Sequence, residues 1–555
     1  MKQISRILVL LATSACAVFA DGLPGVGPVW DNQSDTWVAK DRLGRAVPTS
    51  EETGAPRADR TVAMFYFLWH ESVHPGPFDN SKIIAADPDA MKKPTSPPWG
   101  PLHAPHHWGE SIFGYYIGDD EGVLRKHAQM LGDAGVDVIV FDTSNRLTYQ
   151  RNYRKLFEVF HKVRQEGNRA PAVAFLTPFW DPSSTVAELY DQLYSQKVGQ
   201  NLWFQWEGKP LILANPKQVD ARVQDFFTFR NPQPDYFQGP TGPDMWSWLE
   251  VYPQHVFRNS RGEKEQMSVG VAQNAVNGRL GSMSEPGAMG RSLHGGNYAE
   301  QWRRAIQEDP RVVFITGWNE WIAGRFDEFN KIKTPPMFVD QFDQEHSRDI
   351  EPMKGGHQDD YYYQTVNFIR RYKGVRPVPA VVPQPIKVDG KFEDWREVRP
   401  EFRDTINDPV HRKHPGWGNI GIYTNDTGRN DIISAKVSHD RRHVYFYVRT
   451  AQPLTPPAGA TNWMVLLLDT DSNLHTGWLG YDTIIRPGTT PNVAFRYEGC
   501  ELELTLPRSM FKDSFDFKWI DNISPGGDPS ELTLNGDAAP NDRFNYRALL
   551  RPSRR

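Results

Sequence analysis

Several acidic side chains come directly after short apolar runs, and carboxyl groups in such places can act as acids, bases or nucleophiles. They are found in Trp69-His70-Glu71, Asp142, Trp180-Asp181, Glu250 and Trp318-Asn319-Glu320-Trp321. If each run is a strand of a parallel sheet, the groups gather at the carboxyl ends of the strands. Cleavage of a glycosidic bond needs one carboxyl that protonates the leaving oxygen and a second that acts as base or nucleophile. We therefore expect Glu320, Glu71 and Asp142 to be catalytic.

The segment Trp318-Asn319-Glu320-Trp321 is the most specific of these signals. It follows an apolar run and places an Asn-Glu pair between two indoles. Asn319 can hydrogen-bond a sugar hydroxyl, and the indoles can raise the pKa of Glu320 by removing water. The alternative is a buried Glu320 fixed by a residue such as Arg325, with Asn319 capping the next helix.

Further residues in these positions are expected to contact the substrate. The predicted set is Trp69, His70, His107, Trp108, Trp180, Asp181, Glu250, Trp318, Asn319, Trp321 and Glu351. His103, His106 and His107 lie in a Pro-rich loop with a spacing that is not typical of zinc sites, so we predict substrate contact there and no metal. If the substrate is anionic, Lys354, Arg348 and Arg325 are its natural partners.

From residue 61 onward, short apolar runs alternate with helix-period stretches, and these acidic residues stand at the ends of the apolar runs. The runs are residues 62–69, 136–141, 172–176, 210–214, 245–251, 267–272 and 312–316, and the helical stretches are 122–134, 153–166, 184–195, 298–308 and 361–372. This alternation predicts an α/β fold, a (β/α)8 TIM-type barrel whose eighth strand lies within residues 273–297. A doubly wound open sheet is the alternative, although no G-x-G-x-x-G turn follows the first run.

The length of 555 residues predicts two or three domains. Residues 373–386 carry four prolines and no regular period, which is typical of a stiff linker. Beyond them, short alternating runs separated by turn residues predict an all-β sandwich. The expected order is a signal peptide (1–20), an N-terminal extension (21–60), the barrel (61–374), the linker (375–386) and the sandwich (387–551).

Composition indicates which kinds of binding partner the protein can have, and the N-terminus indicates its cellular location. A net charge of −5 with both signs mixed argues against nucleic acid, and no run beyond the N-terminus is long enough to span a membrane. The basic start, the apolar residues 7–12 and the small residue Ala20 predict a secretory signal, with a lipid anchor at Cys16 as the alternative. We expect a secreted protein of the periplasm or the bacterial cell surface.

The Trp318 to Trp321 segment resembles the motif W-N-E-W-x-E of the glycoside hydrolase family 99 and family 71 group, and of related barrel proteins from polysaccharide-biosynthesis clusters. The resemblance covers residues 61–373 and includes the G-V-D-V-I-V-F-D run that ends at Asp142 and the G-K-P-L-I run at 208–212. It implies a glycosidase barrel in which both motif glutamates are catalytic, the first as base and the second as acid.

The chain departs from that motif at its second glutamate. Glu320 matches the first, but Ala323 stands where the second is expected, and the I-E-P that follows in the family occurs here only at Ile350-Glu351-Pro352, as if residues 324–348 were an inserted loop. The proton donor must then come from elsewhere. Glu71 and Asp142 are favoured because strand ends position side chains better than loops do; Asp349, Glu351, Asp327 and Glu328 are the alternatives.

The C-terminal region resembles family 9 carbohydrate-binding modules through residues 388–395, 438–440, 468–473 and 476–482. The D-x-D-x-N turn at Asp469, Asp471 and Asn473 could hold a structural Ca²⁺, or it is a plain Asx-rich turn. Trp463 and Trp478 are either a sugar clamp or core residues.

Together these features predict a glycoside hydrolase that acts on a polysaccharide or glycan, and an open barrel mouth favours cleavage inside the chain. The alternative from a different class is a non-catalytic carbohydrate-binding protein on a degenerate glycosidase barrel, which Ala323 favours. A sugar-transferring enzyme is a third hypothesis, and the predicted export away from nucleotide-sugars argues against it.

Overall fold

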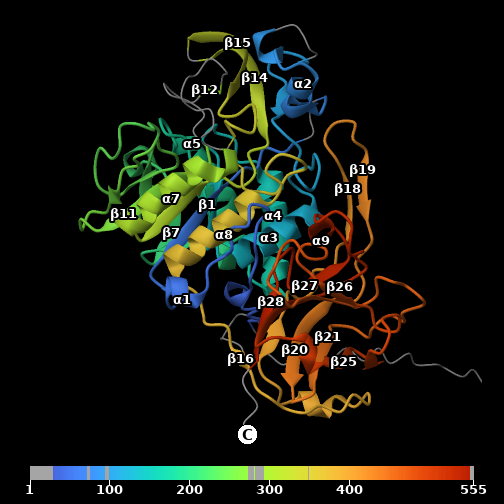
Figure 1. Ribbon diagram of the computed structural model, residues 1–555. Coiled ribbons are helices and arrows are strands. Elements are labelled where there is room, and N and C mark those ends of the chain that lie inside the picture. Colours follow the sequence, from blue (N-terminus) through green and yellow to red (C-terminus); the bar gives the residue numbers. More distant parts are fainter. Residues whose placement is uncertain are drawn as a thin grey trace, which may run out of the picture. The chain divides into compact units, whose positions relative to one another are not determined.

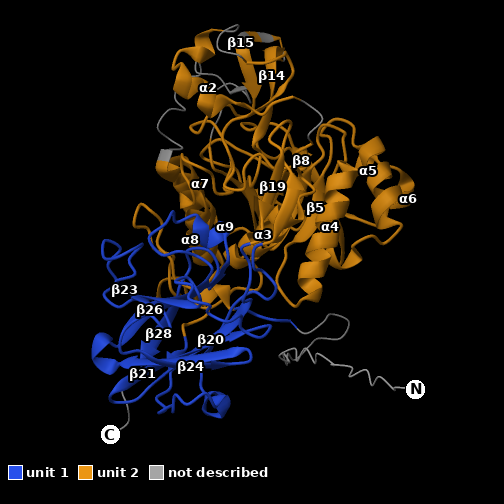
Figure 2. Ribbon diagram, turned by 90° about the vertical axis from the view of Figure 1, so that its right-hand side faces the viewer, with its two compact units in different colours: residues 1–32, 379–410, 427–555 blue, residues 33–378, 411–426 orange. Residues whose placement is uncertain are grey.

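The computed structural model describes residues 29–71, 75–93, 99–272, 280–281, 293–329, 331–347 and 349–550. The chain divides into two compact units, which Figure 2 shows in different colours. Unit 1 takes its residues from 1–32, 379–410 and 427–555, and unit 2 takes its residues from 33–378 and 411–426. The short segment 411–426 therefore belongs to unit 2, although the sequence on both sides of it belongs to unit 1.

The central sheet of unit 2 has ten strands: nine follow the order β10-β11-β13-β1-β4-β5-β7-β8-β9, and β6 pairs with β7. The bounds are β1 Thr61–Tyr66, β4 Val138–Asp142, β5 Ala172–Leu176, β6 Gln205–Trp206, β7 Lys209–Leu213, β8 Thr228–Gln233, β9 Met245–Ser247, β10 Phe257–Arg258, β11 Lys264–Gly270 and β13 Val312–Thr316. The strands from β11 to β9 are parallel, while β10 and β6 are antiparallel to their neighbours. Buried apolar side chains on both faces explain why these runs lack a polar face.

The α-helices of unit 2 differ widely in length. They are α1 Ser50–Thr53, α2 Asn80–Ala86, α3 Glu121–Ala134, α4 Gln150–Gln165, α5 Ser183–Leu189, α6 Ala221–Gln224, α7 Gly296–Glu308 and α8 Asp360–Lys373. Helix α3 is defined at both ends: Asp120 accepts hydrogen bonds from the Gly122 and Val123 N–H groups, and Gly135 ends it at a φ of 85°. Figure 1 shows α3, α4, α7 and α8 along the central sheet.

The predicted (β/α)8 barrel is wrong. Helices make up only 22% of the structure, the central sheet is mixed and nearly closed, and helices do not alternate regularly with strands. No helix lies between β8 and β9, and only the four residues of α6 stand as α-helix between β7 and β8. The sequence pattern missed β8 because Arg230, Asn231 and Pro232 interrupt its apolar character.

The strand expected within residues 273–297 falls mostly outside the described residues. The described part, β12 (Leu280–Gly281), pairs with β15 instead of joining the central sheet. A second sheet of unit 2 has the order β12-β15-β14-β3-β2, with β2 Phe78–Asp79, β3 Pro105–His107, β14 Ile322–Phe329 and β15 Ile332–Val339. Most of the apparent inserted loop is thus an antiparallel hairpin, which stands beside α2 in Figure 1.

Unit 1 consists of two sheets. One has the order β16-β28-β26-β22-β23 with β27 on β26, from β16 Ala380–Val381, β22 Val465–Asp469, β23 Thr483–Ile485, β26 Ser514–Asp521, β27 Asp537–Ala539 and β28 Tyr546–Leu550. The other has the order β17-β20-β21-β25-β24, from β17 Glu401–Arg403, β20 Ile432–His439, β21 His443–Thr450, β24 Ala494–Glu498 and β25 Glu501–Pro507. Phe402 and Phe446 contact Phe517 across the two sheets, with ring centroids 5.1 and 6.0 Å apart. A short helix, α9 (Glu531–Leu534), adjoins β27.

Candidate functional site

Unit 2 contains a cavity of about 450 Å³ at the carboxyl ends of its central strands. Its lining residues are mainly acidic, aromatic and aliphatic, with a few small or polar ones: Phe65, Phe67, Trp69, Glu71, Pro105, Asp142, Ser144, Asn145, Leu147, Tyr149, Phe179, Trp248, Glu320, Ile322, Ala323, Gly324, Phe326, Phe329, Val339, Asp340 and Trp417. This size lies within the range of small-molecule sites, and aromatic lining is typical of them.

The three residues predicted as catalytic line this one cavity. Strands β13, β1 and β4 are adjacent and parallel, so the residues that follow them meet at one edge of the sheet. Glu320 follows β13, Glu71 follows β1, and Asp142 is the last residue of β4. Asp340, which follows β15, is a fourth carboxylate in the lining and was not predicted.

Aromatic rings form much of the cavity wall. Trp69 packs against Phe67 and Tyr149, with centroids 5.0 and 6.4 Å apart. Burial raises the pKa of Tyr149 to about 12, and the nearby charges of Asp142 and Glu71 act in the same direction. The cavity therefore combines a negative potential with flat apolar surfaces.

Glu320 is 3% exposed and is held from behind by Asp349. Its backbone N–H donates a hydrogen bond to Asp349 Oδ1, and the indole N–H of Trp108 donates to Asp349 Oδ2. Burial, together with the charge of Glu320, raises the pKa of Asp349 well above its usual range. Asp349, one of the alternative proton donors, is thus a fully buried support and does not line the cavity.

Asn319 and the two motif tryptophans are support residues as well. Asn319 Oδ1 accepts the Phe67 N–H at 2.9 Å, and its Nδ2 donates to Phe67 O and Tyr116 Oη, so the amide ties the β13 end to the β1 end. Trp318 is buried against His127, and Trp321 is stacked on Trp108 at 4.9 Å. None of the three lines the cavity.

Glu351 was predicted to bind substrate, but it is fully buried beneath the motif. Its carboxylate accepts from Ser111 Oγ (2.6 Å), Tyr116 Oη (2.8 Å) and Trp321 Nε1 (2.6 Å), and His127 Nε2 lies at 3.3 Å. Burial raises its pKa, but His127 and the hydrogen bonds outweigh burial and hold the pKa below its usual value.

Two of the predicted histidines, His70 and His107, are also covered by protein. His70 is stacked on Tyr116, and burial lowers its pKa to about 4. His107 lies in β3 against Tyr115, and burial lowers its pKa well below the usual value. Both are neutral at ordinary pH, and neither lines the cavity.

Three predicted contacts lie outside the cavity for different reasons. Trp180 is 74% exposed and packs edge-on against Phe179, which does line the cavity, at 6.4 Å. Asp181 accepts a hydrogen bond from Ser183 Oγ at 2.6 Å, and its other carboxylate oxygen lies 3.9 Å from Arg146 Nη2. Glu250 is buried beside His255, and burial raises its pKa to about 8.

Four side chains with a predicted role in proton donation or charge binding do not line the cavity. Asp327 and Glu328 lie on β14, and both are exposed. Lys354 pairs with Glu110 at 2.6 Å, and Arg325 donates to Gly100 O at 2.8 Å. Arg348 lies outside the described residues.

A scan against models of known protein families finds no match in this chain. A search of curated proteins finds no match either. The resemblance to the family 99 and family 71 group therefore stays a prediction that rests on the residues alone.

Trp417, Asp340 and Tyr149 are lining residues that sequence reasoning missed. Trp417 stands between two glycines beyond the proline-rich linker, so it was assigned to the sandwich. Asp340 follows a strand within the apparent insertion. The apolar-run rule that found Asp142 would have found Asp340 had residues 332–339 been read as a strand.

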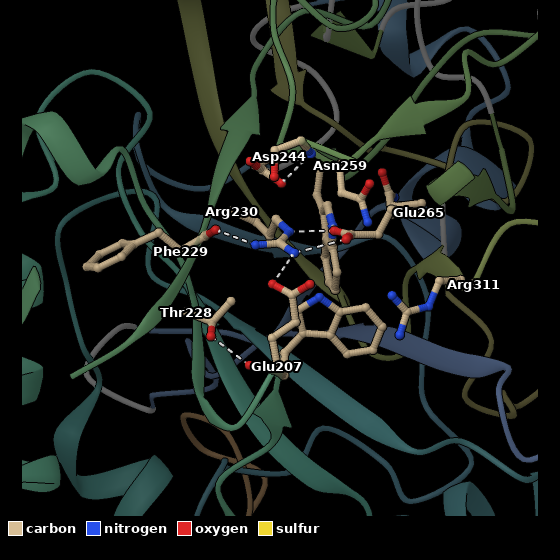
Figure 3. Close-up of polar contacts among 12 residues, drawn as sticks. Glu207, Thr228, Phe229, Arg230, Asp244, Asn259, Glu265 and Arg311 are labelled. Carbon is tan, nitrogen blue, oxygen red and sulfur yellow. Dashed lines mark hydrogen bonds and ion pairs between the residues drawn. The ribbon is translucent and has the colours of Figure 1, made fainter. Parts of the chain in front are cut away.

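A second buried polar cluster of unit 2 lies at the other ends of the strands. Figure 3 shows the Arg230 guanidinium between the carboxylates of Glu265 and Glu207, with Nη2 2.9 and 3.1 Å from their oxygens. Trp246 also donates its indole N–H to Glu265 at 2.7 Å. Arg230 and Glu265 are early residues of β8 and β11, so the cluster joins strand starts and is structural.

In unit 1, the turn predicted to hold Ca²⁺ has a different set of oxygens. Carboxylate oxygens of Asp469, Asp471 and Asp482 lie within 4.8 Å of one another, whereas the side chain of Asn473 accepts the His475 N–H. The segment is also an Asx-rich turn, because Asp469 Oδ1 accepts the Ser472 N–H and Asp471 Oδ1 accepts the Asn473 N–H. A second such group is Asp404, Asp408 and Asp537. Calcium binding stays a prediction.

The two candidate clamp tryptophans of unit 1 are both anchored. Trp463 is buried against Tyr497 and donates to Thr455 O at 2.7 Å. Trp478 donates to Gly527 O at 3.0 Å and keeps part of its ring exposed. Within the described part of the chain, no helix has the length and apolar character needed to cross a membrane.

Proposed function

We propose that this protein is a glycoside hydrolase that cleaves a polysaccharide or glycan in the cavity of unit 2. The observation that carries the proposal is that Glu71, Asp142 and Glu320, which come from three neighbouring parallel strands, line one aromatic cavity. Carboxylates that converge in a partly dry site can hold different protonation states, which acid–base cleavage requires.

Glu320 acts as base or nucleophile, and Glu71 is the proton donor that we favour. Asp142 Oδ1 accepts the Ser144 N–H at 2.9 Å, and a bond of this kind stabilises the charged form of a carboxyl. Asp142 is thus better suited to stay ionised than to donate a proton. In the reaction, Glu71 transfers its proton to the glycosidic oxygen as the bond to the anomeric carbon breaks. Water supplies the new hydroxyl, and its other proton passes to Glu320 if Glu320 is the base, or back to Glu71 if Glu320 is the nucleophile that water then displaces.

The test is release of reducing ends from a panel of neutral polysaccharides by the full-length protein. Glu320→Gln keeps the shape of the side chain and should lower kcat by about 10²–10⁴-fold. Glu71→Gln removes the proposed proton donor and should also lower kcat. Glu110→Gln, a partly exposed carboxyl paired with Lys82 and Lys354, is the control. Unchanged turnover in Glu320→Gln would falsify the assignment.

A second candidate is a sugar-binding protein without catalysis. Ala323 lines the same cavity and supplies no proton donor where the resemblance implies one. This candidate predicts that oligosaccharides bind with no turnover of any member of the panel, and that Glu320→Gln leaves the affinity nearly unchanged.

A further inference from the structure

One wall residue of the cavity comes from the far side of the proline-rich linker in sequence. Trp417 belongs to the hairpin of β18 (Arg412–Pro415) and β19 (Ile422–Asn425), which the contacts assign to unit 2. The Gly416 N–H donates to Gly421 O at 2.7 Å and closes the hairpin. The Trp417 ring is 1% exposed and packs edge-on against His107, with centroids 5.2 Å apart.

The base of this hairpin is fastened to the start of α3. Arg412 pairs with Asp120 at 2.7 Å, and the carboxylate of Asp120 is 1% exposed. The same guanidinium donates to Phe113 O at 2.8 Å and lies over the Tyr423 ring at 4.2 Å. Since Asp120 also caps α3, the hairpin is attached to a rigid element rather than to a loop.

Hydrogen bonds hold the tip of the hairpin at Trp417, and two glycines stand where a Cβ would clash with a neighbouring oxygen. The Trp417 N–H donates to Tyr115 O at 2.8 Å, and the Tyr115 N–H donates to Tyr423 Oη at 3.0 Å. Gly418 has a φ of 56°, and a Cβ there would lie 2.3 Å from Gly76 O. A Cβ on Gly114 would lie equally close to Tyr423 Oη. The glycines therefore let the indole approach the cavity at a defined position.

We propose that the hairpin of residues 411–426 places Trp417 in the wall of the glycan site, where its ring contacts a sugar of the bound chain. The inference rests on the proposed function and adds a binding residue to it. An aromatic ring that protein covers on one side and a cavity borders on the other is typical of ligand pockets. The buried Nε1 of Trp417 has no hydrogen-bond partner among the described residues, and a sugar hydroxyl would supply an acceptor.

The kinetic test uses the full chain and the polysaccharide that wild type hydrolyses fastest. Trp417→Ala should raise KM about tenfold or more and change kcat less, because it removes binding surface and leaves the carboxylates in place. Ile422→Ala is the control: this side chain belongs to the same hairpin and is 65% exposed. A KM within about twofold of wild type in folded Trp417→Ala overturns the inference.

A second measurement does not depend on turnover or on the stability of the alanine variant. The Glu320→Gln protein is labelled with 5-fluorotryptophan, and its Trp417 fluorine signal is assigned by its loss in Trp417→Phe. Tetrasaccharides of glucose, mannose, galactose and xylose are then added. The inference expects a saturable shift of the Trp417 signal and none of the Trp463 signal.

The outcomes separate the two proposals. Turnover by wild type with an unmoved Trp417 signal overturns the hairpin inference and leaves the hydrolase. A shifted Trp417 signal without turnover of any substrate overturns the hydrolase and leaves the binding wall. Neither binding nor turnover across the panel overturns both.

Discussion

Trp321 donates its indole N–H to the buried carboxylate of Glu351, with 2.6 Å between Nε1 and Oε2. This bond joins the residue after Glu320 to an acid that three further polar groups surround. On the other side of the same turn, Asp349 accepts the Glu320 N–H. The Asp349-Ile350-Glu351 segment thus positions the candidate catalytic loop without touching the cavity.

Glu351→Gln should therefore act through the positions of its neighbours. The amide replaces one acceptor oxygen by a donor that faces other donors, so we expect a loss of about 3 kcal/mol in the free energy of unfolding. In the fraction that folds, kcat should fall more than KM rises, because Glu320 is displaced while the aromatic walls remain. Urea denaturation and steady-state kinetics measure the two effects. Equal stability of wild type and Glu351→Gln would contradict this role.

Glu250 should make the stability of unit 2 depend on pH. Burial raises its pKa from 4.5 to about 8, and His255 lies against it, with Nδ1 3.1 Å from Oε1. Below pH 4.5 the group is protonated in both the folded and unfolded states. As the pH rises towards 8, only the unfolded state ionises, and stability is lost. Glu250→Gln should remove a loss of a few kcal/mol between about pH 5 and 8. Urea unfolding midpoints of wild type and Glu250→Gln at about pH 5 and about pH 8 test this pH dependence. Glu51→Gln, at an exposed carboxyl, is the control.

Removing one partner of the buried Arg230–Glu265 ion pair should lower the free energy of unfolding strongly. Glu265→Gln leaves the buried guanidinium without its full counter-charge and should reduce the free energy of unfolding by about 3–5 kcal/mol. Arg261→Ala removes an exposed partner of Glu207 and should cost about 1 kcal/mol or less. Thermal and urea unfolding distinguish the two variants, and similar losses in both would show that burial of Arg230 does not control its contribution.

Trp180 should contribute to the binding of long substrates and not of short ones. Its ring is 74% exposed beside Phe179, which lines the cavity, so it can stack on a sugar outside the cavity. Trp180→Ala should raise KM about fivefold or more for a polysaccharide and leave a disaccharide substrate unaffected. Because the ring is exposed, the melting temperature should not change. Leu43→Ala, another exposed apolar side chain, is the control, and equal effects on long and short substrates would reject the stacking role.

Acidic polysaccharides should be poor substrates. Among the described residues that line the cavity, four are carboxylates and none is Lys, Arg or His. A uronate or sulfate placed there meets like charge, so kcat/KM should be at least about tenfold lower than for a neutral polymer of the same linkage. Added salt should narrow the difference. Parallel assays on neutral and carboxylated forms of one polymer provide the measurement.

Part of this structure could be predicted from the residues because local patterns dictate it. Runs such as 138–142 and 312–316 are apolar on both faces, so they had to be buried strands, and the acids directly after them had to meet if those strands were neighbours. That reasoning placed Glu71, Asp142 and Glu320 in one group without coordinates. It failed for β8, whose Arg230 is buried through a partner from β11 that no local pattern reveals.

From the sequence alone one could predict which acids meet at one edge of the central sheet and where most strands of that sheet lie. Tertiary structure decided the rest, because burial and partnership depend on residues far apart in the chain. Trp318, Asn319, Trp321 and Glu351 look like substrate contacts in sequence, yet packing turns them into the support of Glu320. Trp417 reaches the cavity because the hairpin of residues 411–426 is fastened to Asp120, a long-range ion pair that spacing and periodicity cannot encode.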